Sequence, residues 1–303
     1  MKKRLTLFSL LLLFTMTAMT KTFVDGIYYN LNESDNTAEV TSGTDYRGNI
    51  VIPASISWDG VDYSVTSIGE RAFKGCYRLR SIVIPNSVTS IGGAAFSGCS
   101  GLTSIEIPTS VTSIGELVFF YCSDLTSIVV EEGNSYYDSR DNCNAIIETA
   151  SNKLIAGCQN TVIPTSVTSI GYGAFSYCDG LTSIEIPNSV TEIGESAFAY
   201  CYGLTSITMQ RATPPTVGSN LFDQCSKLKT IYVPVGASKA YNVAPWNEYN
   251  IVEGEVTGIE SVTQEEWPAD VYDLNGRMVK AQAENLDGLP KGVYIVNGKK
   301  FVK

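Results

Sequence analysis

The side chains that most often carry enzyme chemistry are sparse in this chain of 303 residues, which contains no histidine. Hydrolysis of the Ser-His-Asp or Cys-His type, histidine-ligated zinc and an imidazole pH switch are therefore excluded. Carboxylates remain, as in glycoside hydrolysis. Glu106 and Glu185 occupy equivalent positions in a repeated segment. Their repeats are three strands apart, and at about 4.8 Å per strand the two carboxylates are separated by roughly 14 Å. This is too far for two carboxylates acting on one bond, so we expect no catalytic site and no cofactor.

Cysteine is the other reactive side chain. Six of the eight cysteines recur at one position of the repeated segment: Cys76, Cys99, Cys122, Cys178, Cys201 and Cys225. One interpretation is a ladder of disulfides or metal ligands. The other is a small buried thiol that fills a corner of each unit. The sequence contains no C-x-x-C pair, which argues against zinc and favours the buried thiol.

Composition excludes further classes of protein. With 44% hydrophobic and 17% charged residues, the chain can bury a core and is neither disordered nor collagen-like. The formal net charge is -10. Nucleic-acid binding needs a basic surface, so we expect no nucleic-acid partner.

The N-terminus has the layout of a secretory signal peptide. Lys2, Lys3 and Arg4 precede an apolar stretch that runs from Leu5 to Phe14, and small or polar residues follow. We therefore predict a signal peptide over 1–20 and a secreted or cell-surface location. No later stretch is apolar and long enough to span a bilayer as a helix, so we expect no membrane-spanning segment.

A repeat of 23 residues organises the middle of the chain. Copies that read VTSIGERAFKGCYRLRSIVIP and the like begin at Val65, Val88, Val111, Val167 and Val190. Repeats of 20 to 29 residues with this Leu/Ile spacing indicate a leucine-rich solenoid. We predict a β-rich α/β fold: a right-handed leucine-rich repeat solenoid with short strands and single helical turns, followed by a small C-terminal β module.

Each unit has a strand with one buried and one exposed face. In LRSIVIP, Leu79, Ile82 and Ile84 point inward, and ERAFKGC supplies the helical turn. Stacking predicts two buried columns, one of phenylalanines and one of aliphatic residues. Their members are Phe73, Phe96, Phe119, Phe175, Phe198 and Phe222, and then Ile84, Ile107, Val130, Ile163, Ile186, Met209 and Val233.

An insert of 33 residues interrupts the period. Its segments CNAIIE and KLIAGC predict a hairpin joined by TASN, within an insert at about 131–160. Pairing Glu148 with Lys153 in an unbroken register places Cys143 opposite Cys158. We hypothesise a disulfide there, which an oxidising compartment would favour; two free thiols are the equal alternative.

The two ends of the repeat array differ from its middle. Residues 21–64 predict an N-terminal β cap, with a repeat-like strand in GNIVIP. The repeats then occupy 65–250. Residues 251–303 predict a linker and a β module of two hairpins, each with an Asn-Gly turn.

Two exposed rows are candidates for binding. The solvent side of the principal strands carries Val83, Glu106, Val129, Val162, Glu185, Thr208 and Tyr232, and suits a broad, shallow contact unless it is simply a solvated face. Tyr121, Tyr177 and Tyr200 stand just before the repeated cysteine. This aromatic stripe could stack on sugar rings or anchor a protein, or could pack over the turn.

The unit V-x-x-I-G-x-x-A-F-x-x-C-x-x-L-x-x-I-x-I-P resembles the BspA-like leucine-rich repeat family of exported bacterial surface proteins. The tail, VYDLNGRMVK and LPKGVYIVNGKKFVK, is similar to the end of C-terminal sorting domains but lacks their opening Pro-Asn-Pro strand. The resemblance implies a solenoid without catalysis and, for some members, adhesion to host matrix proteins or cells. Our leading hypothesis is a surface protein that binds extracellular or host proteins; the alternative is a carbohydrate-binding surface protein.

Overall fold

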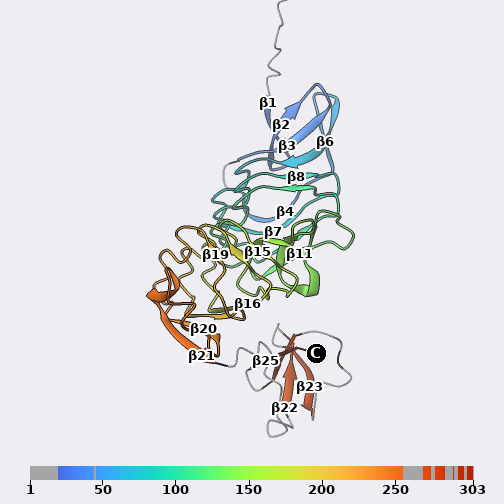
Figure 1. The fold of residues 1–303 in the computed structure, drawn as a ribbon. Helices are drawn as coiled ribbons and strands as arrows, with labels where there is room; N and C mark the ends of the chain where they lie inside the picture. Colours follow the sequence, from blue (N-terminus) through green and yellow to red (C-terminus); the bar gives the residue numbers. More distant parts are fainter. Residues whose placement is uncertain are drawn as a thin grey trace, which may run out of the picture.

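The computed structural model describes residues 20–43, 46–254, 269–273, 277–283, 289, 293–296 and 299–302. Residues 1–19 of the predicted signal peptide and residues 255–268 of the predicted linker lie outside this range. The described repeats stack as the successive rungs of a strand-rich solenoid (Figure 1). This confirms the leucine-rich solenoid predicted from the 23-residue period.

Two series of parallel strands run along the solenoid. The principal strands are β7 (Leu79–Val83), β9 (Ser104–Ile107), β11 (Ser127–Val130), β16 (Ser183–Ile186), β18 (Ser206–Met209) and β20 (Thr230–Pro234). The second series holds the VTSIG segments, in β8 (Ser90–Ile91), β10 (Ser113–Ile114), β15 (Ser169–Ile170), β17 (Glu192–Ile193) and β19 (Thr216–Val217). Ser104 pairs with Ser127 and Ser183 pairs with Ser206, so one repeat length separates paired residues.

The predicted single helical turns are tight turns instead. In the first unit, the Cys76 N–H donates to the Phe73 carbonyl (3.0 Å). Arg71 has a left-handed φ of 56° and Gly75 one of 76°, which interrupts any helical run. The N–H groups of Arg71 and Gly75 donate to the carbonyls of Gly93 and Ser97 in the next unit. Backbone N–H groups that would form hydrogen bonds within a helix therefore form them with the next rung instead.

The core follows the two predicted columns. Phe73 stacks on Phe96 with ring centroids 5.3 Å apart, and Phe175 stacks on Phe198 at 5.0 Å. Every member of both predicted columns is buried. Tyr46 extends the aromatic column at one end, 4.8 Å from Phe73, and Trp246 closes the other, 5.7 Å from Phe222.

The N-terminal cap is a small sheet continuous with the repeats. It contains β1 (Thr20–Val24), β2 (Ile27–Asn32) and β3 (Thr37–Val40), and β3 pairs in parallel with β6 (Val61–Ile68). Strand β5 (Ser55–Trp58) pairs with β6, and β4 (Gly48–Val51), from the GNIVIP segment, pairs with β7. Because β6 crosses the boundary predicted at 64, cap and first repeat share a strand.

The insert is a hairpin that separates the core into two clusters. Strands β13 (Ala145–Glu148) and β14 (Lys153–Gly157) form the predicted hairpin, preceded by β12 (Tyr137–Asp138) and the 3-10 turn η1 (Arg140–Asn142). Ile146 faces the N-terminal core cluster, whereas Ala145 and Ile147 face the C-terminal one. Both faces of the hairpin are therefore buried, which explains its run of apolar residues.

The hairpin also supplies a second-series strand for the rung that the insert interrupts. Strand β14 pairs in parallel with β15, so it takes the place of a VTSIG strand. Gly157 stands beside the Phe175 ring at the position where other rungs carry phenylalanine, and a Cβ atom there would overlap that ring. The aromatic column is thus interrupted at this rung.

The C-terminal boundary lies later than expected. Strand β21 (Asn250–Gly254) pairs in parallel with β20, so the solenoid extends through Gly254 rather than ending at residue 250. Near the C-terminus, β22 (Ala269–Tyr272), β23 (Met278–Ala283), β24 (Val293–Val296) and β25 (Lys299–Val302) form an antiparallel sheet. Both predicted hairpins are present, although their Asn-Gly turns lie outside the described residues.

The contact between Gly157 and Phe175 gives a test of this packing. We expect Gly157→Ala to destabilise the chain by about 1 to 3 kcal/mol, because the added methyl forces the buried ring to move. Urea unfolding followed by circular dichroism measures the change. Gly254→Ala is the matched control, since a Cβ atom at that position meets nothing within 4 Å. Equal stability of the two variants would contradict the packing described.

Candidate functional site

The solvent side of the principal strands carries side chains that are paired between neighbouring strands. Val51 pairs with Val83, Glu106 with Val129, and Thr208 with both Glu185 and Tyr232. Val252 pairs with Tyr232 at the C-terminal end. We call this set the outer row: Val51, Val83, Glu106, Val129, Glu185, Thr208, Tyr232 and Val252.

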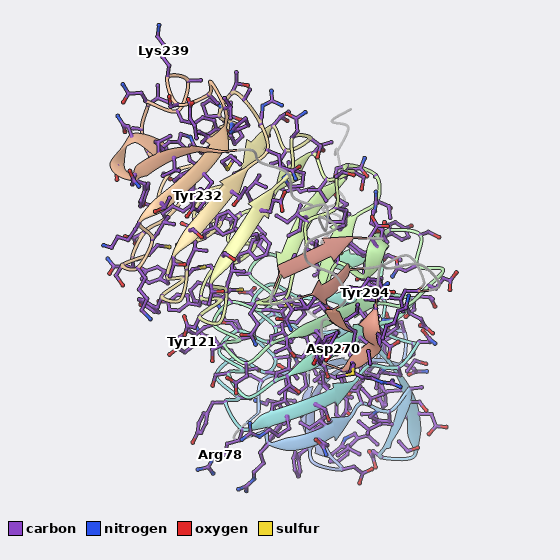
Figure 2. The ribbon with its side chains drawn as sticks, turned by 90° about the horizontal axis from the view of Figure 1, so that it is seen from below. Arg78, Tyr121, Tyr232, Lys239, Asp270 and Tyr294 are labelled. Carbon is purple, nitrogen blue, oxygen red and sulfur yellow. The ribbon has the colours of Figure 1, made fainter. Side chains whose placement is uncertain are left out.

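Half of the outer row consists of apolar or aromatic side chains that are strongly exposed to solvent. Val51 is 66% exposed, Val83 55%, Val129 43% and Tyr232 41%. Figure 2 shows Tyr232 on the strands near the C-terminal end of the solenoid. Exposed apolar side chains aligned on neighbouring strands are a feature of contact surfaces. Val51 and Val252 were not among the predicted row members, although the repeat-like GNIVIP segment could have identified Val51.

Val162 does not belong to the outer row, contrary to the sequence prediction. It lies outside any strand, is half-buried, and donates its N–H to the Cys143 carbonyl (3.1 Å). The TVIP segment of this rung forms no strand. The principal strands fall into three sheets: β4 with β7, β9 with β11, and β16, β18, β20 and β21 together. The predicted row is divided in the same way.

A groove of about 570 Å³ lies where the row is broken. Strand β11 forms one side, and the insert contributes mostly amides and hydroxyls from Ser139, Asn142, Asn144 and Asn160. The Ser139 hydroxyl accepts the Val130 N–H (2.9 Å) and donates to the Ala145 carbonyl (2.7 Å). The groove therefore has a mixed lining, with Val129 and Val130 of β11 opposite polar side chains of the insert, and hydrogen bonds join the insert to the strand beside it.

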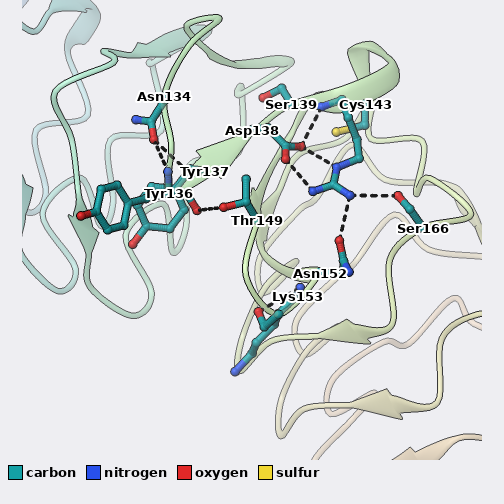
Figure 3. A network of polar contacts seen from close by, with 12 residues as sticks. Asn134, Tyr136, Tyr137, Asp138, Ser139, Cys143, Thr149, Asn152, Lys153 and Ser166 are labelled. Atoms are coloured by element: carbon teal, nitrogen blue, oxygen red, sulfur yellow. Dashed lines mark hydrogen bonds and ion pairs between the residues drawn. The ribbon is translucent and has the colours of Figure 1, made fainter.

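A network of polar contacts holds the insert in place (Figure 3). The Arg140 guanidinium donates two hydrogen bonds to the Asp138 carboxylate, at 2.7 and 2.6 Å. It also donates to Asn152 Oδ1 (2.8 Å) in the hairpin turn. The buried Asn134 amide donates to the carbonyls of Pro108 and Val111, both at 2.9 Å. The insert is thus fastened both to itself and to the preceding rungs.

The repeated cysteines are structural thiols that hydrogen-bond between rungs. Cys99 Sγ donates to the Phe73 carbonyl (3.1 Å), and Cys201 Sγ donates to the Phe175 carbonyl (3.0 Å). Cys122 and Cys225 make the same contact with the preceding phenylalanine, and all eight cysteines are free. Burial raises the pKa of Cys99 to about 12. This arrangement agrees with the buried-thiol interpretation.

Cys143 and Cys158 are not opposite each other in the hairpin. Glu148 pairs with Lys153 as predicted, but a register shift next to Ile146 pairs Ala145 with Gly157. Both thiols are buried and free, and Cys158 Sγ donates to the Asn144 carbonyl (3.4 Å). The unbroken register was therefore wrong, and the irregularity that breaks it has no signal in the sequence.

The tyrosines of the aromatic stripe lie together but cover one another. Tyr177 stacks on Tyr200 with centroids 4.5 Å apart and planes at 6°, and Tyr121 meets Tyr177 edge to face at 4.7 Å. Phe120 and Tyr202 also contact Tyr177, and neither was predicted. Tyr121 remains 45% exposed and Tyr202 40%. Figure 2 shows Tyr121 at the margin of the solenoid.

All three predicted stripe tyrosines adopt a left-handed backbone. Their φ angles are 61°, 61° and 60°, and Gly75 and Gly98 occupy the same position in the first two units. This conformation costs a side-chain-bearing residue of order 1 to 2 kcal/mol. Packing of the rings on one another offsets that cost. Glycine is therefore a substitution that the backbone tolerates at these positions.

Repeated rungs, parallel strands and a shared core define a leucine-rich repeat solenoid. A family model described as "BspA type Leucine rich repeat region" matches six copies over residues 55–151 and 146–261. The chain belongs to this family. Within the described residues, no helix is long and apolar enough to cross a membrane.

Solved structures include bacterial leucine-rich repeat proteins similar to this chain. One is a leucine-rich cell surface protein from Faecalibacterium prausnitzii A2-165, at 21% identity over 77% of this chain and 94% of that one, with a TM-score of 0.41. Another is a leucine-rich repeat protein from Bacteroides ovatus, at 25% identity over 70% and 72% of the two chains, with a TM-score of 0.34. A search of curated proteins finds no match.

The burial of the cysteines predicts that their thiols react slowly in the native chain. At pH 8 the native chain is expected to react only slowly with a disulfide reagent such as DTNB, because seven of its eight thiols are buried and burial raises the pKa of Cys99 and Cys143 to about 12. A hydrogen bond with Cys201 lowers the pKa of Cys225, so burial rather than lack of thiolate limits the reaction of this thiol. After unfolding without reductant, eight thiols should react. A count of six would instead restore the hypothesis that Cys143 and Cys158 form a disulfide.

Proposed function

We propose that this chain is a non-enzymatic, exported surface protein that binds extracellular or host proteins, including matrix proteins, and so mediates adhesion. Membership of the BspA-type family supports the general class. The observation that carries the proposal is the apolar character of the outer row, whose valines are up to 66% exposed. A flat sheet with aligned apolar side chains suits a broad protein contact better than a small molecule.

Catalysis has little support from the arrangement of acids. Glu106 and Glu185, the two carboxylates of the outer row, lie on separate sheets. The groove beside β11 is lined by amides, hydroxyls, the paired Asp138 and Arg140, and two further carboxylates, Glu131 and Glu132. The Glu131 carboxylate accepts the Thr109 N–H (3.0 Å), so it is engaged with the preceding rung. The chain has no histidine to serve as a base. A binding role therefore accounts for the surface better than an enzymatic one.

Carbohydrate binding at the tyrosine stripe is the weaker alternative. A sugar ring stacks on an open aromatic face. The ring of Tyr177 is instead stacked against Tyr200, and Tyr121 and Phe120 contact it edge to face. Only Tyr121 and Tyr202 keep substantial exposure. The stripe is thus better suited to cover its turn than to bind a sugar ring.

The outer row can be tested with substitutions that the repeat already contains. Glutamate occupies this row at Glu106 and Glu185, so Val83→Glu and Val129→Glu together should leave the fold intact. We expect the double variant to lose about tenfold or more in affinity, because a charge would be desolvated at the contact. Surface plasmon resonance against fibronectin, fibrinogen and laminin measures the change.

The control is Val61→Glu with Val243→Glu, two exposed valines away from the row. The control should bind like the wild type. The proposal for the outer row would be overturned if the wild type bound none of the three matrix proteins, or if both double variants bound equally well.

A second comparison separates the two ligand classes. Replacement of Tyr121, Tyr177 and Tyr200 by glycine, the residue at this position in the first two units, should leave matrix-protein affinity within about threefold of wild type. A neutral glycan array should remain silent for both forms. Glycan binding by the wild type that disappears in the triple variant would favour the carbohydrate alternative.

A further inference from the structure

The first repeat unit differs in charge from the four VTSIG-type units that follow it. It carries four cations where the next four units carry none: Arg71, Lys74, Arg78 and Arg80. At the position of Lys74 the later units have serine, phenylalanine, alanine or aspartate, and at the position of Arg80 the next four have threonine. In a chain with a formal net charge of -10, this is a local reversal of sign.

The structure exposes all four cations, three in the turn that precedes β7 and Arg80 in β7 itself. Ala72, Phe73, Cys76 and Leu79 point into the core, whereas Arg71, Lys74, Tyr77, Arg78 and Arg80 are exposed. Hydrogen bonds from this turn to Gly93, Ala95 and Ser97 of the next unit fix its backbone. Figure 2 shows Arg78 pointing outward from the solenoid. We call these five exposed residues the basic rung.

Three of the cations have no acidic partner. Arg71 forms an ion pair with Glu70 (3.1 Å), but among the described residues no ion pair engages Lys74, Arg78 or Arg80. The guanidinium of Arg78 lies over the ring of Tyr77, 5.3 Å from its centroid, and Tyr77 is 58% exposed. The rung therefore offers free positive charge next to an open aromatic face.

We propose that the basic rung binds an anionic polysaccharide, of the sulfated kind that carries several negative groups on neighbouring sugars. Sulfates would accept hydrogen bonds from Lys74, Arg78 and Arg80, while a sugar ring packs on Tyr77. This ligand and this place differ from both the outer row and the tyrosine stripe. The inference goes beyond the proposed protein-binding function and does not rest on it.

The charge of the flanking rungs distinguishes this ligand from a nucleic acid. The equivalent turn of the second unit, residues 93–103, has no charged side chain, and that of the third carries Glu116 and Asp124. A duplex that extended along the solenoid would meet these acids after one rung. A short cluster of sulfates fits within the rung, so a compact anionic saccharide is favoured over a long polyanion.

The experiment measures binding of the full chain to immobilised heparin as the sulfated probe. The test variant is Lys74→Ser, Arg78→Gly and Arg80→Thr, each a residue that other units carry at the same position. The matched control removes three cations elsewhere through Lys227→Gly, Lys229→Thr and Lys239→Ser. Thermal unfolding of both variants verifies that the fold is kept. We expect about tenfold or greater loss of affinity in the test variant only, and wild-type binding that weakens as NaCl rises.

Three results would overturn the inference. The first is no wild-type binding to heparin at about 50 mM NaCl, where screening is weak. The second is equal loss in the control variant, which would make the interaction one of overall charge. The third is binding to chemically desulfated heparin or to a 20-base-pair DNA duplex as tight as to heparin. Tyr77→Ser adds a second readout, because it should weaken heparin binding without changing the charge.

Discussion

Every rung of this solenoid depends on a neighbour with the same spacing, because a single unit is too small to bury its own apolar residues. Two contacts express this dependence at each step. The phenylalanine ring lies on that of the next rung, 5.3 Å away for Phe73 and Phe96, and the cysteine thiol donates to the phenylalanine carbonyl of the rung before. The last unit keeps both contacts although it is one residue longer, because Phe222 still lies 6.0 Å from Phe198 and Cys225 Sγ still donates to the Phe198 carbonyl. The buried contacts are therefore kept while the length and the exposed positions of a unit can vary.

The hairpin shows how the period can be broken without breaking the core. Strand β14 pairs with β15 as a repeat strand would, and Gly157 leaves room for the Phe175 ring. The hairpin presents Ile146 to one core cluster and Ile147 to the other. No principal strand forms at this rung, where the Val162 N–H donates to the Cys143 carbonyl. A groove between β11 and the insert lies at this break in the exposed surface.

The sequence was sufficient where structure follows from repetition. The solenoid, the buried columns and the hairpin with its Glu148–Lys153 pair all follow from periodicity and alternation. It was insufficient where a local irregularity decides the outcome. The register shift next to Ile146 moved Cys143 away from Cys158, and the left-handed residues in the turns replaced helical turns with tight ones. The three tyrosines predicted to form a stripe contact one another, but the sequence does not show that Tyr177 is covered by its neighbours.

The hairpin has a further consequence for the order in which the chain assembles. Contacts between rungs join residues about 23 positions apart, whereas Glu148 and Lys153 are joined through a turn of four residues. Closing a short loop costs less chain entropy than closing a long one, so this hairpin can form before any rung is complete. Apolar residues on both of its faces are then available for a neighbouring rung to pack against. The cap hairpins β1–β2 and β5–β6 close over even shorter turns, but they lie at one end of the array. Folding that starts at the internal hairpin can proceed toward both ends.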